Sequence, residues 1–381
     1  MATRNTSDKV TSFTMTSGNV STFRDEWEVL ILLREIRPLA PAGYTACALY
    51  LLFLAIVATV GNSTTIVMFS RNKKLRNKPH NMLLINLALS DLGTSIFGYP
   101  WTMSSCFAER WLWGPWGCQI QGFTTFVFAL SDMYTLTLVS VYRWIAVCLP
   151  QHNHRLNYRV TLKVIAGIWI LSIVLCGLPL VGVSRYTYEP FGTSCTIDWD
   201  WQTPLNILYV YMLILLCYLI PVGIMSYCYY KVVNRSGQLL RTMKASKGKP
   251  LNLGEAEQAN NTIAESKVTW ISLLMVVVFV VIWSPYAFVC VWAFYTDEIP
   301  VWLNTLPTMC CKASCMLNPV IFYLTNPVFR NTFRATFMRN HKVDSQGAPG
   351  GLQTFKVDKT KEGIFIGENN VTFRKAETTL F

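Results

Sequence analysis

The chain has 381 residues, of which 52% are hydrophobic and only 14% are charged. Together with a mean hydropathy of +0.33, this composition excludes an ordinary soluble enzyme and a disordered chain, and it predicts a membrane protein. The net charge of +12 would suit a nucleic-acid-binding protein, but aromatic and basic residues do not alternate as they do in such sites. We therefore expect no nucleic-acid partner.

Seven apolar runs are long enough to cross a bilayer, which takes about 20 residues in a helix. They cover residues 44–70, 81–103, 118–149, 160–183, 205–232, 268–294 and 301–324. We predict an all-α membrane protein, a bundle of seven transmembrane helices over residues 44–325. Residues 1–43 form a tail before the bundle, and residues 341–381 form a tail of disordered composition after it.

The basic residues predict the orientation of the bundle. The connection after the first run is rich in them, with Arg71, Lys73, Lys74, Arg76 and Lys78, whereas the connections on the opposite side are poor in Lys and Arg. By the positive-inside rule the N-terminus lies outside the cell membrane and the C-terminus inside, where the positive charge faces anionic lipid. The N-terminal tail then places two N-glycosylation sequences, at Asn5 and Asn19, on the outer side.

A short segment after the seventh run has a different pattern. Residues 326–340 carry apolar side chains at Val328, Phe329, Phe333 and Phe337, with basic residues between them. This spacing predicts a short amphipathic cytoplasmic helix on the inner leaflet. A general membrane-surface role is sufficient to explain it.

Two cysteines stand apart from those inside the apolar runs. Cys118 opens the third run on the outer side, and Cys195 lies in the outer connection before the fifth. Both face an oxidising compartment, where a disulfide persists. We predict a bond between them that holds the outer connection over the mouth of the bundle.

Lys312 is the most unusual residue of the seventh run, because Cys311 and Ala313 flank it deep in an apolar stretch. A lysine at the centre of a membrane helix costs about 2.5–3.5 kcal/mol. A desolvated amine of this kind can form a Schiff base with an aldehyde. The alternative is a lysine that lines a wet cavity or pairs with a buried carboxylate.

Motifs in every run resemble those of the rhodopsin-like seven-helix receptors, and within them the opsins, over roughly residues 44–340. They comprise Gly61-Asn62, Asn86 to Asp91, Tyr142-Arg143-Trp144, Trp169, Pro221, Tyr229, Trp283-Ser284-Pro285-Tyr286, and Asn318-Pro319 to Phe322. Opsins carry their retinal-binding lysine six residues before this Asn-Pro pair, which is the position of Lys312. The resemblance implies a light-sensing G-protein-coupled receptor with 11-cis- or all-trans-retinal as its cofactor.

The resemblance also implies a carboxylate that balances the charge of a protonated Schiff base. Vertebrate visual pigments use a Glu three residues after the third-run Cys, but here that residue is Gln121. Other opsins use a Glu six residues before the disulfide Cys of the outer connection, which is Glu189. A counterion at Glu189 resembles the arrangement in neuropsins, peropsins and Go-opsins rather than that in rod or cone pigments. This arrangement predicts a bistable, photoreversible pigment. The alternative is an ordinary solvated Glu.

The resemblance places further residues around the cofactor. Trp283 and Tyr286 would supply aromatic walls, since a polyene needs a long apolar slot. Gln121, Gly122 and Phe123 would line the third-run side, and Phe191 would close the lid. For the Trp, packing in an ordinary core is the alternative.

Other positions would carry the signal. Asn62, Asp91 and Asn318 would form a polar cluster that binds water or sodium, although a purely structural hydrogen-bond network is a close competitor. At the cytoplasmic end Arg143 follows Tyr142 instead of an acidic residue and precedes Trp144 instead of Tyr. Glu265 remains as a partner for Arg143. Together with Tyr229, Pro319 and Phe322, which replaces a Tyr, this pattern predicts a looser inactive state or altered G-protein activation.

The implied partners are a heterotrimeric G protein, membrane lipid and, through tail hydroxyls at Ser345, Thr354, Thr372, Thr378 and Thr379, a receptor kinase and arrestin. The alternative for these hydroxyls is the ordinary composition of a disordered tail. Two other functions stay open, a light-driven retinal photoisomerase like the retinochromes and peropsins, and a chemoreceptor that uses Lys312 as a salt-bridge partner. We expect no catalytic residues and no metal, since the four histidines all lie near the cytoplasmic face.

Overall fold

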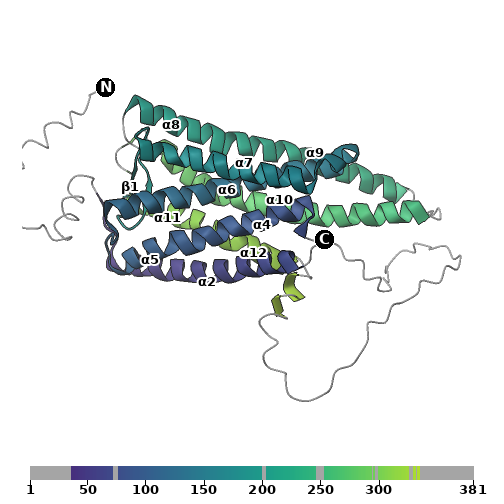
Figure 1. Cartoon of the computed structure of the whole chain (residues 1–381). Helices are drawn as coiled ribbons and strands as arrows, with labels where there is room; N and C mark the ends of the chain where they lie inside the picture. The colour runs from purple at the N-terminus through teal and green to yellow at the C-terminus, as the bar shows by residue number, and fades with distance from the viewer. Residues whose placement is uncertain are drawn as a thin grey trace, which may run out of the picture.

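A computed structural model describes residues 36–71, 76–199, 203–245, 253–293, 295–296, 299–325, 329–331 and 333–334; side chains are described in these ranges except at 239–240, 242–245 and 253–267. The helices run side by side along one axis and form a single bundle (Figure 1). Asn5, Asn19 and the tail over 341–381 lie outside the described residues.

The first four predicted runs are helical, and each begins two to four residues before its predicted start. They are α2 (Pro41–Arg71); α4 (Pro79–Gly93), the π-helical turn η2 (Thr94–Gly98) and α5 (Tyr99–Phe107); α6 (Gly114–Cys148); and α7 (Tyr158–Gly177) with the 3-10 turn η4 (Leu178–Val181). A short 3-10 helix, η3 (Pro150–Arg155), connects α6 to α7. Asn157 caps the start of α7, where its side chain accepts a hydrogen bond from the amide of Val160.

The fifth and sixth runs form long helices that continue beyond the apolar stretch. They are α8 (Pro204–Ile214), the π-helical turn η5 (Leu215–Leu219) and α9 (Ile220–Ala245), followed by α10 (Leu253–Trp292). Pro285 lies inside α10, where it removes a backbone donor. Among the described residues, six helical segments satisfy the length and hydropathy of a membrane span.

The seventh run is helical as predicted, but it is interrupted. It consists of α11 (Val301–Lys312) and α12 (Ser314–Thr325), each 12 residues long and separated by Ala313. The amide of Met316 donates to the carbonyl of Ala313 instead of Lys312, and the Lys312 carbonyl accepts from the hydroxyl of Tyr99 at 2.5 Å. The break therefore leaves the Lys312 carbonyl without a donor from its own helix, and the Tyr99 hydroxyl of α5 takes the place of that donor.

A two-stranded hairpin in the outer connection was not predicted. Strands β1 (Tyr186–Tyr188) and β2 (Cys195–Ile197) are antiparallel, and Tyr188 pairs with Cys195. The predicted disulfide is confirmed, since Cys118 at the start of α6 bonds to Cys195 with a Cα–Cα distance of 5.5 Å. The hairpin lies at the end of the bundle where α2 begins (Figure 1).

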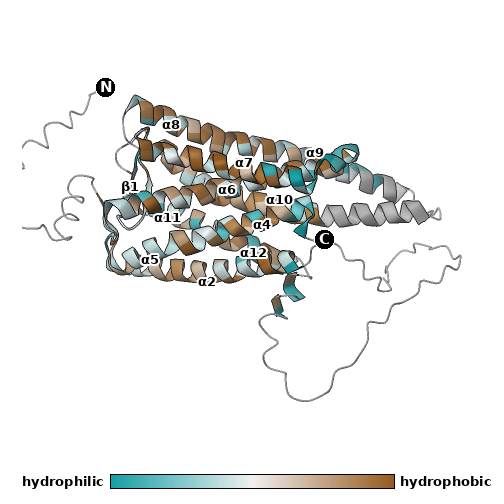
Figure 2. Ribbon diagram, viewed as in Figure 1, coloured by the Kyte–Doolittle hydropathy of each residue, from teal (hydrophilic) through white to brown (hydrophobic). Residues whose placement is uncertain are grey.

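Apolar and polar side chains are distributed as in a membrane protein. The outer faces of the helices are mainly hydrophobic over their central parts (Figure 2), and large apolar residues such as Phe53, Ile170 and Leu208 are exposed. In contrast, Asp91 and Asp132 are buried inside the bundle. Lipid can solvate the exposed apolar side chains but not the carboxylates. A bundle with apolar residues outside and carboxylates inside is therefore a multi-pass membrane protein.

Part of the predicted amphipathic helix lies within the described residues. Residues 329–331 and 333–334 are helical and leave the end of the bundle at an angle to α12 (Figure 1). Phe329 is buried, and its ring lies 6.0 Å from that of Phe322. The Tyr323 and Phe333 rings make a second contact at 5.4 Å. Apolar contacts therefore anchor the start of this segment to α12.

Candidate functional site

A cavity inside the bundle brings several helices and the hairpin together around Lys312. Its wall consists of Thr94, Thr125, Phe126, Ala129, Asp132, Glu189, Cys195, Thr196, Trp283, Tyr286, Thr308, Cys311, Lys312, Ser314 and Cys315. Of the residues predicted from sequence, the wall contains Lys312, Glu189, Trp283 and Tyr286. Residues from six separate segments of the chain are needed to form it, so no local pattern could have outlined it.

Lys312 ends α11 at the break in the seventh span, with its side chain partly buried. Its ammonium group lies 3.5 Å from the hydroxyl of Ser194, to which it donates. Ser194 belongs to the turn of the hairpin, and its hydroxyl also accepts a hydrogen bond from Thr102 at 3.3 Å. The lysine therefore extends toward the outer connection, where polar groups can solvate its charge.

Glu189 is held in place by the turn between the two strands. Its amide donates to the carbonyl of Ser194 at 2.8 Å, and its carbonyl accepts from the amide of Gly192 at 2.8 Å. Gly192 has φ +79°, a left-handed conformation that glycine adopts without a steric penalty. The turn thus points a carboxylate into the cavity.

The Glu189 side chain is 5% exposed, which excludes the alternative of a solvated loop residue. Burial raises the pKa of this carboxyl to about 7, while the positive charge of Lys312 and the hydroxyl of Tyr286, 3.5 Å from Oε1, oppose the rise. A second positive charge in the cavity would favour the ionised form further. Glu189 is therefore an acid poised between its two charge states.

Tyr286 and Trp283 form an aromatic wall on α10. The Tyr286 hydroxyl lies 2.7 Å from the hydroxyl of Thr196, and the indole nitrogen of Trp199 donates to it at 3.3 Å. The rings of Trp283 and Tyr286 meet edge to face with centroids 6.2 Å apart. Trp283 also stacks on Phe279, one turn earlier in α10, at 5.6 Å. Thr196 and Trp199 were missed by the sequence analysis because they follow the disulfide cysteine.

Four residues predicted to line the cofactor site lie beside the cavity and not in its wall. Gly122 packs against Tyr186, since a Cβ added at Gly122 would be 2.4 Å from the Tyr186 ring. Phe123 packs in the same cluster around Tyr186. The hairpin covers this part of α6, so Thr125, Phe126 and Ala129 form the wall instead.

Gln121 and Phe191 have supporting positions. The Gln121 amide accepts a hydrogen bond from the backbone of Cys195 at 3.1 Å and donates to Thr102 at 3.4 Å. Phe191 is fully buried in a separate apolar cluster, and its carbonyl accepts from the Tyr44 hydroxyl at 2.9 Å. Both residues hold the hairpin, one to α6 and the other to α2.

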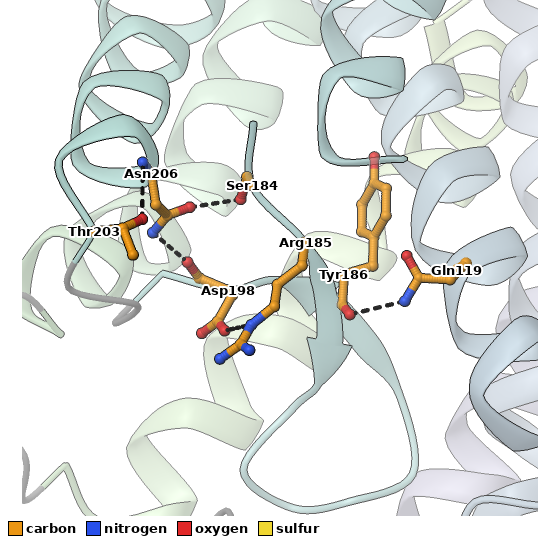
Figure 3. A network of polar contacts seen from close by, with 7 residues as sticks. All are labelled: Gln119, Ser184, Arg185, Tyr186, Asp198, Thr203 and Asn206. Atoms are coloured by element: carbon orange, nitrogen blue, oxygen red, sulfur yellow. Dashed lines mark hydrogen bonds and ion pairs between the residues drawn. The ribbon is translucent and has the colours of Figure 1, made fainter. Parts of the chain in front are cut away.

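A polar network outside the cavity fixes the two ends of the hairpin (Figure 3). Arg185 forms an ion pair with Asp198, and the Asp198 carbonyl accepts a hydrogen bond from the Asn206 side chain at 2.9 Å. Gln119 donates to the carbonyl of Tyr186 at 3.0 Å. These contacts tie the hairpin to α8 and α6, and so they fix where Glu189 can lie.

Deeper in the bundle the predicted polar cluster is present in part. Asn318 donates to Asp91 at 2.9 Å. Asn62 instead donates to the carbonyls of Ala58 and Cys315, at 3.0 and 2.9 Å, and thereby joins α2 to α12. Pro319 packs closely on Gly61, where an added Cβ would approach it to 2.6 Å.

Asp132 belongs to this region and was missed by the sequence analysis. It is 2% exposed, and one of its oxygens lies within 4.8 Å of a carboxylate oxygen of Asp91 and of the Cys315 sulfur. A signal for it exists in the sequence, because an acidic residue inside an apolar run is rare and normally functional.

The end of the bundle opposite the hairpin shows which contacts Tyr142 makes in place of an acidic residue beside Arg143. The Tyr142 hydroxyl lies 3.2 Å from that of Thr161 and so joins α6 to α7. Trp144 contacts the ring of Tyr227 at 6.2 Å. Arg143 and Tyr229 are buried. The Glu265 side chain is outside the described part of the structure, so its pairing with Arg143 stays a prediction.

Comparisons with known proteins agree with this architecture. Residues 61–322 match the model of the 7 transmembrane receptor (rhodopsin family). Opsin-5 of Homo sapiens is 32% identical over 74% of this chain and 78% of its own length. The visual pigment-like receptor peropsin of Homo sapiens is 30% identical over 76% and 83%. The crystal structure of squid rhodopsin superposes with a TM-score of 0.72 at 26% identity, covering 81% of this chain and 89% of that one.

Proposed function

This chain belongs to the opsins, within the rhodopsin family of seven-transmembrane receptors, and we propose that it senses light through retinal attached to Lys312, with Glu189 as the counterion. The observation that carries the proposal is that these two residues, 123 positions apart in the sequence, lie in the wall of one buried cavity.

The residues present suit a retinal group. Retinal supplies an aldehyde that condenses with a lysine amine and a polyene that changes shape when it absorbs light. Of the described residues that line the cavity, Lys312 is the only one with an amine, and Phe126, Ala129 and Trp283 contribute apolar, partly aromatic surface. A cavity with one amine, the carboxylates of Glu189 and Asp132, and several apolar groups in its wall can hold a long cationic polyene.

Glu189 supports a bistable pigment. The Tyr286 hydroxyl donates to the Glu189 carboxylate. Ser194 connects Glu189 to Lys312, because its hydroxyl accepts from the Lys312 ammonium group and its backbone carbonyl accepts from the Glu189 amide. Because Gln121 is uncharged and donates to Thr102, Glu189 is the carboxylate that balances charge at the outer end of the cavity. Its location on the hairpin, not on a moving helix, lets it serve the pigment before and after illumination.

Trp283 provides the route from the cavity toward the cytoplasm. It lies in the cavity wall and stacks on Phe279, which is packed in the cluster that contains Met275, Tyr229 and Tyr142. A displaced Trp283 ring would disturb this core and favour a different position of α10. A heterotrimeric G protein would then bind at the cytoplasmic end near Arg143, and a receptor kinase and arrestin would act on the tail.

The first experiment is an absorption spectrum of the purified full chain, incubated in darkness with 11-cis-retinal or with all-trans-retinal and recorded before and after illumination. We expect a band that shifts with light and disappears in Lys312→Ala. Glu189→Gln should keep the band but move it with pH. A folded protein that forms no such band with either isomer would contradict the proposal, and would favour a chemoreceptor in which Lys312 binds an anionic ligand.

A retinal photoisomerase with weak G-protein coupling is the second candidate. Two observations favour it. Position 142, which is acidic in signalling receptors of the family, is a Tyr that contacts Thr161, and the chain is similar to peropsin. The same spectra distinguish the two, since a photoisomerase would bind all-trans-retinal preferentially and release the 11-cis isomer after illumination. A light-dependent increase in nucleotide exchange on a G protein would support the receptor.

A further inference from the structure

A chain of hydrogen bonds leads from Trp199 to Glu189 across the outer end of the cavity. The indole nitrogen of Trp199 donates to the Thr196 hydroxyl at 3.0 Å and to the Tyr286 hydroxyl at 3.3 Å. The Thr196 and Tyr286 hydroxyls lie 2.7 Å apart, and the Tyr286 hydroxyl lies 3.5 Å from Oε1 of Glu189. The proposed function gives Glu189 and Tyr286 their roles and leaves Trp199 and Thr196 without one.

The two ends of this chain have opposite hydrogen-bonding capacities. An indole N–H can only donate a hydrogen bond, and an ionised carboxylate can only accept one, whereas the two hydroxyls between them can do either. If each hydroxyl donates toward Glu189, every proton in the chain has an acceptor. If the Tyr286 hydroxyl donates to Thr196 instead, the Glu189 carboxylate loses this donor.

Distance alone favours the order that deprives Glu189, because the Tyr286 oxygen lies 2.7 Å from Thr196 and 3.5 Å from Glu189. Trp199 opposes this preference. A hydroxyl that accepts a hydrogen bond is polarised by it and becomes a stronger donor and a poorer acceptor. By donating to Thr196, the indole therefore favours donation from Thr196 to Tyr286 and leaves the Tyr286 proton for Glu189.

Packing holds the Trp199 ring where it can do this. Its centroid lies 6.1 Å from that of Phe126 on α6 and 6.1 Å from that of Tyr286 on α10. Thr196 and Glu189 are buried, so the order of donors within the chain is decided by the protein groups themselves.

We propose that Trp199 is a positioning residue, which occupies the Thr196 hydroxyl and thereby directs the Tyr286 hydroxyl to Glu189, so that the counterion stays ionised. The importance of this charge rests on the proposed function, but the order of the hydrogen bonds does not depend on retinal. Burial raises the pKa of Glu189 to about 7, while Lys312 and Tyr286 oppose the rise. The carboxyl therefore titrates where its ionisation can be followed.

The test is a pH titration of the full chain without retinal, followed by the infrared band of the protonated Glu189 carboxyl. Glu189→Gln identifies this band by its absence. Trp199→Phe keeps an aromatic ring but removes the donor, so we expect the midpoint to move to higher pH by about one unit, the effect of one hydrogen bond to the charged form. With retinal bound, the absorption band should show the same shift in its pH dependence.

A second substitution separates this role from simple packing. Adding Thr196→Val to Trp199→Phe removes the competing acceptor, so the midpoint should return to that of the wild type, whereas a packing defect would grow. Thr196→Val alone should not raise the midpoint, since Tyr286 then keeps Glu189 as its acceptor. Trp113→Phe is the matched control, because its exposed indole donates to the Trp101 carbonyl; it should titrate like the wild type.

The other titratable groups near Glu189 are unchanged in these variants. Among the described residues they are Lys312 and Cys311 on α11, Tyr286 and Cys290 on α10, and Asp132 on α6. A shift caused by Trp199→Phe and reversed by Thr196→Val therefore reports the hydroxyl chain.

Two results would overturn the proposal. One is a folded Trp199→Phe protein that titrates like the wild type. The other is a midpoint that Thr196→Val raises, alone or together with Trp199→Phe, since Thr196 would then support the contact with Glu189 instead of competing for it. Failure of the proposed function looks different, because the wild type would form no band with retinal while its infrared titration still responded to Trp199→Phe.

Discussion

At the scale of single residues, Glu189 is a carboxyl group held in an environment very different from water. The hairpin turn buries its carboxyl, and burial raises its pKa from 4.5 to about 7 even though Lys312 and Tyr286 favour the ionised form. In the unfolded chain the same carboxyl returns to its ordinary value. The folded protein therefore binds this proton more tightly than the unfolded chain does, which links stability to pH.

We predict that the retinal-free protein becomes less stable as the pH rises from about 4.5 to about 7, by about 3 kcal/mol if Glu189 acts alone. The sign follows because a raised carboxyl pKa favours folding only while the group is protonated. Glu189→Gln, which stays neutral, should remove this part of the pH dependence. Thermal unfolding at several pH values checks it, and parallel profiles for the two proteins would contradict it.

Gly122 allows a close approach between α6 and the hairpin. An added Cβ would lie 2.4 Å from Cδ1 of Tyr186, and this ring is fixed because its hydroxyl donates to the Cys176 carbonyl at 2.8 Å. Gly122→Ala should therefore destabilise the protein by about 1–3 kcal/mol, the usual cost of overpacking.

The control for this change is Gly167→Ala on α7, where an added Cβ meets nothing within 4 Å. It should leave stability unchanged or raise it slightly, since Ala favours a helix over Gly. Unfolding temperatures of both variants are the measurement. Equal effects would show that helix propensity, and not the contact with Tyr186, governs position 122.

At the scale of elements, α6 is attached differently at its two ends. The outer end is bonded covalently to β2 through Cys118 and Cys195. The cytoplasmic end is joined to α7 by the Tyr142 and Thr161 hydroxyls, a neutral contact of modest strength. A carboxylate at position 142 would instead lie beside Arg143 in the sequence and attract it.

We predict that Tyr142→Glu lowers the activity of the protein in darkness, because an adjacent carboxylate would restrain Arg143 in the inactive arrangement. Tyr142→Phe, which removes only the hydroxyl, should not lower it. The measurement is nucleotide exchange on a G protein in darkness and after illumination, with retinal bound. Unchanged dark activity in Tyr142→Glu would show that this position does not control the inactive state.

At the scale of the whole molecule, the bundle has two chemically different ends. The hairpin, the disulfide and the start of α2 share one end, whereas η3 and the segment after α12 lie at the other (Figure 1). The basic residues at and after the end of α2, such as Arg71 and Arg76, belong to the second end. This asymmetry supports a single orientation in the cell membrane, with the hairpin outside.

We predict that Asn5 and Asn19 carry N-linked glycans and that the acceptor sequence at Asn234, beyond the apolar part of the fifth span, does not. Digestion with an endoglycosidase should increase the mobility of the wild-type protein on a gel. The double variant Asn5→Gln, Asn19→Gln should no longer respond, and Asn234→Gln should respond like the wild type. A glycan at Asn234 would reverse the proposed orientation.

The sequence alone determined the membrane class, the positions of the apolar runs, the Cys118–Cys195 bond and the resemblance to opsins, because hydrophobic length and motif spacing are local properties. It also identified Lys312, since a lysine in an apolar run is conspicuous without any partner. It predicted a seventh helix but not the break at Ala313, because the donor that satisfies the freed Lys312 carbonyl, the Tyr99 hydroxyl, comes from another helix.

Only the tertiary structure decided which residues surround Lys312. It replaced Gly122 and Phe123 by Thr125, Phe126 and Ala129 in the cavity wall, because the hairpin, itself unpredicted, covers the outer part of α6. It also brought Asp132 to Asp91 and Cys315. Such groupings depend on how helices far apart in the sequence pack and rotate against one another, whereas a single sequence records only the order and spacing of residues along each helix.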